Sequence, residues 1–290
     1  MHLRQKGWIW TFLAPTLLLF AAFYAYPIAT VAISSFTEWR LASAMTYVGL
    51  DNYRSLLTDG EFKKALVNTL VWLLAHWTIY VGMGLLVALL TARKTRFSRF
   101  VRTVYLIPNM LPIAAVAFLF YIVFNPAIGP INGLLELVGL DQLALNWYQD
   151  TRTAFWTVTF TSVIYGGILT LLISAELASI PGEIIESAKM DGAGELRTVF
   201  HITLPLLRNV IGTAMILTTV NVLKSFEIIY LTTVGGPGNE TINLPILIYR
   251  AAMNNNHLSY SNTLGTVTIL IGMISILIIT RVFRMGRSDY

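Results

Sequence analysis

The sequence predicts an all-α polytopic membrane protein with six transmembrane helices and cytoplasmic N- and C-termini. Composition gives the first indication: of 290 residues, 56% are hydrophobic and only 12% are charged, whereas soluble domains carry about 25% charged residues. The second is a series of charge-free runs as long as the roughly 20 apolar residues that cross a bilayer core. The placement of Lys and Arg between these runs supplies the orientation.

The expected spans follow the apolar runs. They lie near residues 8–33, 65–91, 103–124, 153–176, 209–233 and 262–283. The first run exceeds the roughly 7–15 apolar residues of a secretory signal, so we expect an uncleaved span. Pro108 and Pro112 in the third run predict a kink or a broken helix start, with local bending for packing as the favoured interpretation.

Basic residues are concentrated in alternate connections, which predicts the orientation. With the N-terminus inside, the outer loops hold six of them, Arg40, Arg54, Lys63, Lys64, Arg152 and Arg250, and Lys224 lies within a span. The other 13 of the 20 are cytoplasmic: Arg4, Lys6, Arg93, Lys94, Arg96, Arg99, Arg102, Lys189, Arg197, Arg208, Arg281, Arg284 and Arg287. Turn chemistry at Gly129-Pro130 and at Gly235–Gly238 suits outer loops.

A polar segment between the fourth and fifth runs has the pattern of two short helices. Pro181 and Glu183 suit a helix start, because proline fits the first turn and an acid favours the positive end of the helix dipole. Gly192 and Gly194 predict a sharp reversal. The apolar stripes on either side are Ile184, Ile185 and Ala188, then Leu196, Val199, Phe200 and Leu204, with Pro205 marking a break before the next span.

The charges of this segment favour a protein partner over the lipid surface. A lipid-facing amphipathic helix carries a basic polar face that meets anionic headgroups. Here the polar residues are mixed, with four acids against two bases: Glu183, Glu186, Asp191 and Glu195 against Lys189 and Arg197.

The spacing within the segment matches a known pattern. Glu186-Ser187-Ala188 is followed after three residues by Gly192, and after nine more by Ile202-Thr203-Leu204-Pro205. This resembles the "EAA" loop of permease subunits in binding-protein-dependent ATP-binding cassette importers, with Ser187 in place of the usual alanine. The resemblance implies an importer-type permease fold whose first short helix, the coupling helix, docks on a cytoplasmic ATPase. The coupling residues it implies are Glu183, Ile184, Glu186, Ser187, Ala188, Asp191, Gly192 and Ala193.

Further motifs narrow the resemblance to carbohydrate-uptake permeases of the maltose and glycerol-phosphate type. They are Lys224-x-Phe226-Glu227, Leu231-Thr232, Gly235-Gly236-Pro237, Asn68-Thr69, Leu244-Pro245 and Ile248-Tyr249-Arg250. The implied partners are a second homologous permease subunit, two cytoplasmic ATPase subunits that hold ATP and Mg, and an extracytoplasmic solute-binding protein. The implied location is the bacterial or archaeal cytoplasmic (inner) membrane.

The expected organisation has three parts. Residues 1–63 form the first span and outer loop. Residues 64–284 form the permease core, with the coupling loop at 177–208, and residues 285–290 form a short cytoplasmic tail.

Polar residues in the fifth run are candidates for a sugar path. Thr218, Asn221 and Ser225 fall on one helical face, and the resemblance places sugar contacts there; alternatively, such residues join helices to one another. Tyr165 is a candidate for stacking on a sugar ring, or an interface anchor. Glu227 is a further candidate, although pairing with Lys224, three residues away, is the favoured interpretation. His76 is expected to bond locally rather than to relay protons.

Several function classes are disfavoured. The chain has no cysteine and only four scattered histidines, so no thiolate, metal or acid–base group emerges for an enzyme. It has no GxxxxGK[ST] run, so ATP hydrolysis is expected in a separate chain. A secondary transporter would require a coupling-ion site and usually an internal repeat. Nucleic acid is not expected, since the basic residues serve topology. Glycerol phosphate or another polyol is the alternative substrate, but only Lys224 offers a cation for a phosphate.

Overall fold

The computed structural model describes residues 2–41, 43–92 and 95–286. Two compact units divide the chain. The first joins the chain up to Lys63 with Leu247–Leu270, and the second joins Lys64–Ile246 with the chain from Ile271 onward. Of the basic residues used for orientation, Arg93, Lys94 and Arg287 lie outside the described residues, as does most of the predicted tail.

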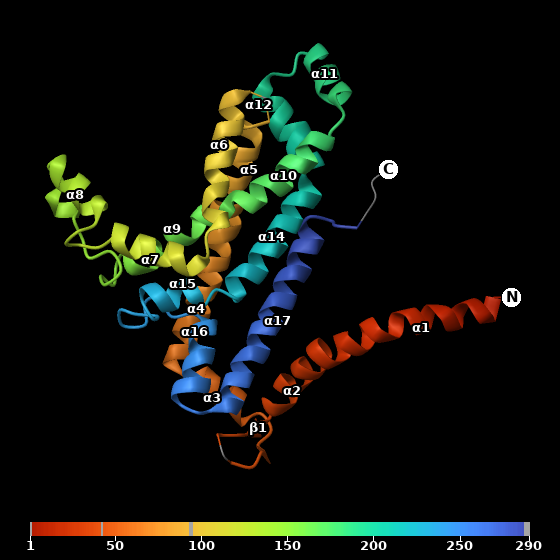
Figure 1. Ribbon diagram of the computed structural model, residues 1–290, viewed down its shortest axis with the longest axis vertical. Coiled ribbons are helices and arrows are strands. Elements are labelled where there is room, and N and C mark those ends of the chain that lie inside the picture. Colours follow the sequence, from red (N-terminus) through yellow and green to blue (C-terminus); the bar gives the residue numbers. More distant parts are fainter. Residues whose placement is uncertain (1, 42, 93–94, 287–290) are drawn as a thin grey trace. The chain divides into compact units, whose positions relative to one another are not determined.

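The described chain is mainly helical, and its long helices match the predicted spans (Figure 1). Four stretches are long and apolar enough to cross a membrane: Trp10–Ser34, Gly60–Leu90, Ala154–Ser179 and Leu258–Val282. Two bent pairs of helices, Arg96–Met110 with Ile113–Val123 and Glu195–Leu206 with Arg208–Leu223, complete six if each pair is one span.

The first unit contains the N-terminal helix and a small hairpin. Its elements are α1 (His2–Phe20), a π-helical segment (Ala21–Ala25), α2 (Tyr26–Ser34), β1 (Thr37–Glu38), β2 (Thr46–Tyr47), α3 (Asp51–Thr58), the π-helical segment Arg250–Asn254 and the start of α17 (Leu258–Val282). The strands are antiparallel, with Thr37 opposite Tyr47. The buried Asn52 amide donates to the carbonyls of Ser35 and Thr37, which fixes the hairpin to α3.

The second unit contains the helices that position the candidate site. They are α4 (Gly60–Ala75), α5 (Val81–Leu90), α6 (Arg96–Leu106), α7 (Ile113–Val123), α8 (Pro130–Leu137), α9 (Ala154–Val163), α10 (Gly167–Ser179), α11 (Gly182–Met190), α12 (Glu195–Thr198), α13 (Leu204–Leu206), α14 (Arg208–Leu223), α15 (Glu227–Thr232) and α16 (Leu244–Tyr249), with the end of α17. The residues of α4 before Lys64 and those of α16 after Ile246 belong to the first unit. Short π or 3-10 segments join several of them.

Three helices form the centre of the second unit. α5, α10 and α14 pack together (Figure 1), and Ala88, Ile173 and Leu207 are fully buried between them. Gly84 allows the close approach of α5 to α10, because a Cβ there would lie 3.1 Å from that of Leu169. Small residues at such contacts are typical of helix pairs in membranes.

The third span is broken more sharply than the favoured local bending. α6 begins at Arg96 rather than near residue 103, and the two halves of the bent pair meet at 104°. Leu111 lies between them in an extended conformation, which Pro112 imposes on the residue before it. The alternative of a broken helix start is therefore correct.

One other expectation of local structure is wrong. The fifth span is not continuous over 209–233, because α14 ends at Leu223 and α15 begins only at Glu227. At Gly129-Pro130 the expected turn leads directly into a helix: residues 126–128 form a turn, Gly129 is the N-cap of α8, and Pro130 occupies the first helical position, where proline is favoured.

Candidate functional site

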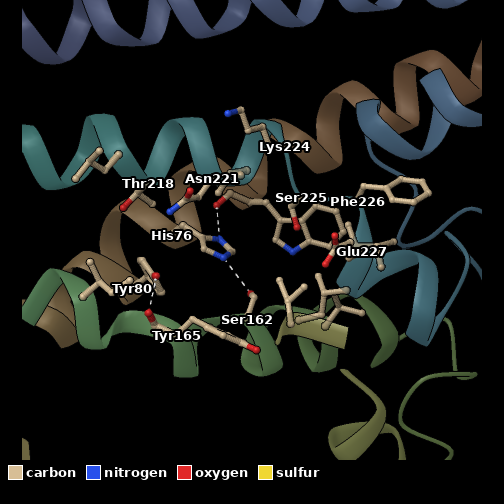
Figure 2. A pocket seen from close by; sticks show the side chains of 18 of the residues that line it. His76, Tyr80, Ser162, Tyr165, Thr218, Asn221, Lys224, Ser225, Phe226 and Glu227 are labelled. Carbon is tan, nitrogen blue, oxygen red and sulfur yellow. Dashed lines mark hydrogen bonds between the residues drawn. The ribbon is translucent and has the colours of Figure 1, made fainter. Parts of the chain in front are cut away.

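A cavity of about 520 Å³ lies within the second unit (Figure 2). Its walls come from α4, α7, α9, α10, α14 and α15 and from the irregular segments that adjoin them. The polar and aromatic residues that line it include Trp72, His76, Tyr80, Asn109, Ser162, Tyr165, Thr218, Asn221, Lys224, Ser225, Phe226 and Glu227.

Three of the cavity's walls lose regular α-helix where they meet the cavity. α4 passes into the π-helical segment His76–Tyr80, α9 into the 3-10 segment Ile164–Gly166, and α14 ends before the non-helical Lys224–Phe226. Irregular backbone at membrane depth is tolerated where it is buried in protein or lines a cavity. π-helical segments are also frequent at functional sites. The coincidence of three interruptions marks this cavity as the candidate site.

Three hydrogen bonds connect the α4 side of the cavity to the α9 side, one of them from Trp72 Nε1 to Thr159 Oγ1 at 2.6 Å. His76 Nε2 lies 3.0 Å from Ser162 Oγ, and its Nδ1 lies 2.8 Å from the Trp72 carbonyl. Tyr80 donates its hydroxyl proton to the Tyr165 carbonyl at 2.8 Å (Figure 2). Both ring nitrogens of His76 thus have partners within the protein, which confirms the expectation of local bonding.

All five predicted path residues line this one cavity. The argument from a common helical face holds for Thr218 and Asn221 but not for Ser225, which lies beyond the end of α14. The Thr218 hydroxyl donates to the Ala214 carbonyl at 2.7 Å, so its proton is used within its own helix. Asn221 and Glu227 are exposed to the cavity, and Tyr165 borders it from the 3-10 segment. Direct contact of these residues with a substrate stays a prediction.

The expected pairing of Lys224 with Glu227 is wrong. The two residues lie on either side of the break between α14 and α15, so they do not share a helical face. Figure 2 shows their charged groups directed to opposite sides, and no ion pair joins them in the described part of the chain. The Glu227 carboxylate is therefore available to the cavity.

Asn109 is a cavity residue that the sequence analysis missed. Its amide donates to the Tyr165 carbonyl at 2.6 Å and accepts from the Gly167 amide at 3.2 Å in the orientation that satisfies both ends. It lies in the 3-10 segment Ile107–Met110, just before the break in the third span. Its position between Pro108 and Pro112 was the sequence feature that could have indicated it.

The coupling segment has the predicted start and turn. α11 begins directly after Pro181, with Glu183 in its first turn. It ends at Met190, and two residues later Gly192 has a φ of 80°, which lies in the left-handed region. The amides of Gly192 and Ala193 donate to the carbonyls of Lys189 and Ala188 at 3.0 and 2.9 Å, which closes the helix end. Gly194 has a φ of −68°, so only Gly192 uses the conformational freedom of glycine.

The coupling residues divide into a buried contact and an exposed surface. Ala188 is buried, whereas Ile184, Glu186 and Ser187 are exposed. Large apolar side chains close to them in sequence are also exposed: Met190, Leu196 and Phe200. After the π-helical segment Val199–Thr203 and α13, the chain bends by 66° into α14. The predicted break therefore lies at Leu207, two residues beyond Pro205.

Metal chemistry has no candidate centre in residues 2–41, 43–92 and 95–286. No group of three or more His, Cys, Asp and Glu side chains in these ranges is arranged to hold an ion.

Comparisons with known proteins give a consistent result. The chain is 32% identical to the multiple sugar-binding transport system permease protein MsmF of Streptococcus mutans, over 94% of each chain. It is 30% identical to the sulfoquinovosyl glycerol transport system permease protein SmoG of Agrobacterium fabrum, over 94% of this chain and 89% of that one.

A solved bacterial ABC transporter involved in the import of the acidic polysaccharide alginate shares the fold. A chain of that structure superposes with a TM-score of 0.84 at 21% identity, over 99% of this chain and 98% of its own length. Residues 81–286, which contain most of the cavity and the whole coupling segment, match the family of binding-protein-dependent transport system inner membrane components, and the chain belongs to this family.

Proposed function

We propose that this permease subunit forms half of the translocation pore for a sugar or oligosaccharide in an ATP-driven importer. The observation that carries the proposal is the cavity at the three helix interruptions. It offers neutral hydrogen-bonding groups from Asn221, Ser225 and Ser162 beside the ring of Tyr165. Such a combination suits a sugar, which presents many hydroxyls and an apolar ring face but no charge.

The coupling role is assigned to α11 and its turn. The exposed Ile184, Glu186 and Ser187 are suited to contact another protein, and the closed turn at Gly192 fixes the direction in which they are presented. We assign the same contact surface to Glu183, Asp191 and Ala193, with Ala188 packed beneath. In this assignment the segment 177–208 faces the cytoplasm and transmits closure of two ATPase subunits to α10 and α14.

The remaining assembly follows from this role. A second homologous permease subunit would complete the pore, and an extracytoplasmic solute-binding protein would deliver the sugar. ATP and Mg would reside on the ATPase subunits, so this chain is not itself an enzyme. We place the protein in the bacterial or archaeal cytoplasmic membrane as a multi-pass chain with both termini inside, residues 64–284 forming its core.

A neutral sugar is favoured over glycerol phosphate or another anionic solute. Glu227 is the acidic group that lines the cavity, and the Lys224 ammonium is directed away from it (Figure 2). A carboxylate that lines the cavity repels an anion. The names of the relatives do not decide the charge, since one is named for multiple sugars and another for sulfoquinovosyl glycerol. Membership of the importer family removes the support for a secondary transporter.

Purification and reconstitution test the proposal. The tagged chain, expressed from its native gene neighbourhood, should purify with an ATPase and a second permease. The complex in proteoliposomes, supplied with its binding protein and internal ATP, should accumulate a labelled neutral sugar from a panel that also contains sugar phosphates and uronates. ATP-dependent uptake of phosphates alone, or purification of a self-sufficient single chain, would reject it.

A further inference from the structure

One buried side chain from outside α14 and α15 holds the break between them. Asn243 is only 1% exposed, and its Nδ2 donates to the Ser225 carbonyl at 2.6 Å. Its Oδ1 accepts from the Ile246 amide at 3.0 Å, where it caps α16. The same amide group therefore satisfies two separate backbone positions, one of them within the non-helical segment that lines the cavity.

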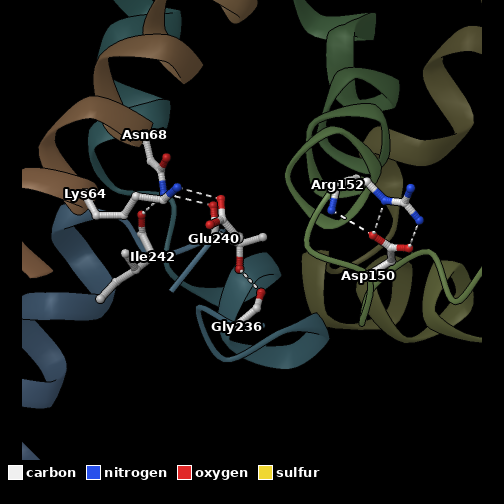
Figure 3. Close-up of polar contacts among 8 residues, drawn as sticks. Lys64, Asn68, Asp150, Arg152, Gly236, Glu240 and Ile242 are labelled. Carbon is white, nitrogen blue, oxygen red and sulfur yellow. Dashed lines mark hydrogen bonds and ion pairs between the residues drawn. The ribbon is translucent and has the colours of Figure 1, made fainter. Parts of the chain in front are cut away.

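Asn243 is in turn held by α4. Asn68 donates its amide protons to the carbonyls of Glu240 and Ile242, at 2.9 and 2.8 Å (Figure 3). The Leu244 amide donates to Thr69 Oγ1 at 3.2 Å. The residues on both sides of Asn243 are thus bonded to one turn of a long helix, and both Asn68 and Thr69 are buried.

The Ser225 carbonyl needs this partner. Ser225 lies in the non-helical segment between α14 and α15, so its carbonyl has no intrahelical donor, and lipid offers no replacement. Ser225 and Glu227 both line the cavity on either side of Phe226, so the direction of this carbonyl sets the direction of their side chains. A carbonyl left without a donor would drive the segment towards another conformation.

We propose that Asn243 is a positioning residue that fixes the Ser225–Glu227 wall of the cavity and ties it, through Asn68 and Thr69, to α4. Its relevance to transport rests on the proposed function, but the placement of the wall does not. The outer loop after α15 and the cavity then form one mechanical unit: a displacement of residues 240–244 displaces the wall. Asn243 itself does not line the cavity.

The absence of cysteine allows a direct test. A Ser225→Cys thiol on the proposed wall and, separately, a Ser162→Cys thiol on the facing wall report local access. Each is prepared with native Asn243 and with Asn243→Asp, which keeps an oxygen for the α16 cap but loses the donor. The full complex in membranes is reacted with 2-sulfonatoethyl methanethiosulfonate, and the modification rates are compared.

We expect Asn243→Asp to change the rate at Ser225→Cys by about fivefold or more, since the lost bond to a buried carbonyl biases a local opening. The rate at Ser162→Cys should stay within about twofold, because no bond of that wall involves Asn243. Asn243→Ser should reproduce the effect, because its hydroxyl can cap α16 but is too short to reach the Ser225 carbonyl. It replaces Asn243→Asp in the experiment if the Asp variant does not insert into the membrane.

Asn132→Asp is the matched control. Asn132 is also buried, and its Nδ2 donates to the Leu145 carbonyl at 3.1 Å, but it does not line the cavity. It should leave the Ser225→Cys rate unchanged. Unchanged rates in both Asn243 variants, or equal changes with Asn132→Asp, would overturn the proposal. Labelling requires no transported solute, so a failure of sugar uptake would reject the proposed function while leaving this result interpretable.

Discussion

The Lys64 ammonium lies 2.5 Å from the Glu240 carboxylate, and this ion pair joins the first turns of α4 to the loop that follows α15 (Figure 3). The Asn68 amide binds the backbone of the same loop one turn further along α4. The two contacts differ in exposure: the ion-pair side chains are 38% and 34% exposed, whereas Asn68 is 6% exposed. Burial decides their relative contribution, because solvent and salt weaken an exposed ion pair.

Asn68→Leu is therefore predicted to destabilise the protein more than Lys64→Met. The leucine leaves two carbonyls unpaired, at a cost of about 1–3 kcal/mol. Loss of the partly exposed ion pair should cost about 1 kcal/mol or less. Thermal unfolding of the purified complex in detergent measures the difference, and adding salt should narrow the gap between Lys64→Met and the native protein. A larger effect of Lys64→Met would contradict this ranking.

Gly192 and Gly194 provide a matched pair in the coupling segment. A Cβ at either position meets no atom within 4 Å, so only backbone conformation distinguishes them. Gly192→Ala forces an L-residue to a φ of 80°, at a cost of about 1–2 kcal/mol, whereas Gly194→Ala is free of this strain. We expect Gly192→Ala to reduce the amount of ATPase that purifies with the permease, and Gly194→Ala to leave it unchanged.

Gly192→Asn sharpens this test, because asparagine tolerates the left-handed region better than alanine. It should recover part of the lost ATPase binding. Equal effects of alanine at both positions would show that side-chain volume rather than backbone angle matters at this turn.

Lys224 and Glu227 are predicted to act independently. Their charged groups point to opposite sides of the α14–α15 break, and no ion pair between them occurs in the described residues (Figure 2). In a double-mutant cycle of Lys224→Gln and Glu227→Gln, changes in melting temperature should add, with a coupling energy below about 0.5 kcal/mol. Recovery of stability in the double variant would restore the pairing that the sequence pattern suggested.

Local sequence signals predicted those parts of the site that depend on neighbouring residues. The spans, the helix start at Pro181 and the turn at Gly192 follow from apolar length, proline and glycine chemistry, all of which act within a few residues. Thr218 and Asn221 followed from helical periodicity, which holds as far as Leu223.

The break after Leu223 could not be predicted from neighbouring residues, because a residue distant in sequence stabilises it. Lys224, Ser225 and Phe226 carry neither proline nor glycine, and their pattern continues the helix. The bond from Asn243 to Ser225 spans 18 residues and decides the conformation. The sequence predicted only part of the break at Leu111. Pro112 indicated its position, but the 104° bend depends on packing against the start of α10.

That packing makes Gly167 a position where a single methyl group should matter. A Cβ at Gly167 would lie 2.5 Å from the Asn109 amide and 2.7 Å from the Tyr105 carbonyl, both next to the break in the third span. The carbonyl belongs to the backbone and cannot rotate away, so Gly167→Ala must displace the segment that carries Asn109. Overpacking of this kind costs about 1–3 kcal/mol.

Gly82 in α5 is the control, because a Cβ there meets nothing within 4 Å and alanine favours a helix by up to about 1 kcal/mol. We expect Gly82→Ala to leave the melting temperature of the complex unchanged or raise it slightly, and Gly167→Ala to lower it. Since Asn109 and Tyr165 both line the cavity, Gly167→Ala should also change the modification rate of the Ser162→Cys thiol. If Gly167→Ala kept the native melting temperature and the native modification rate of Ser162→Cys, the segment between α6 and α7 would accommodate the methyl group without strain. It would then not determine the position of this cavity wall.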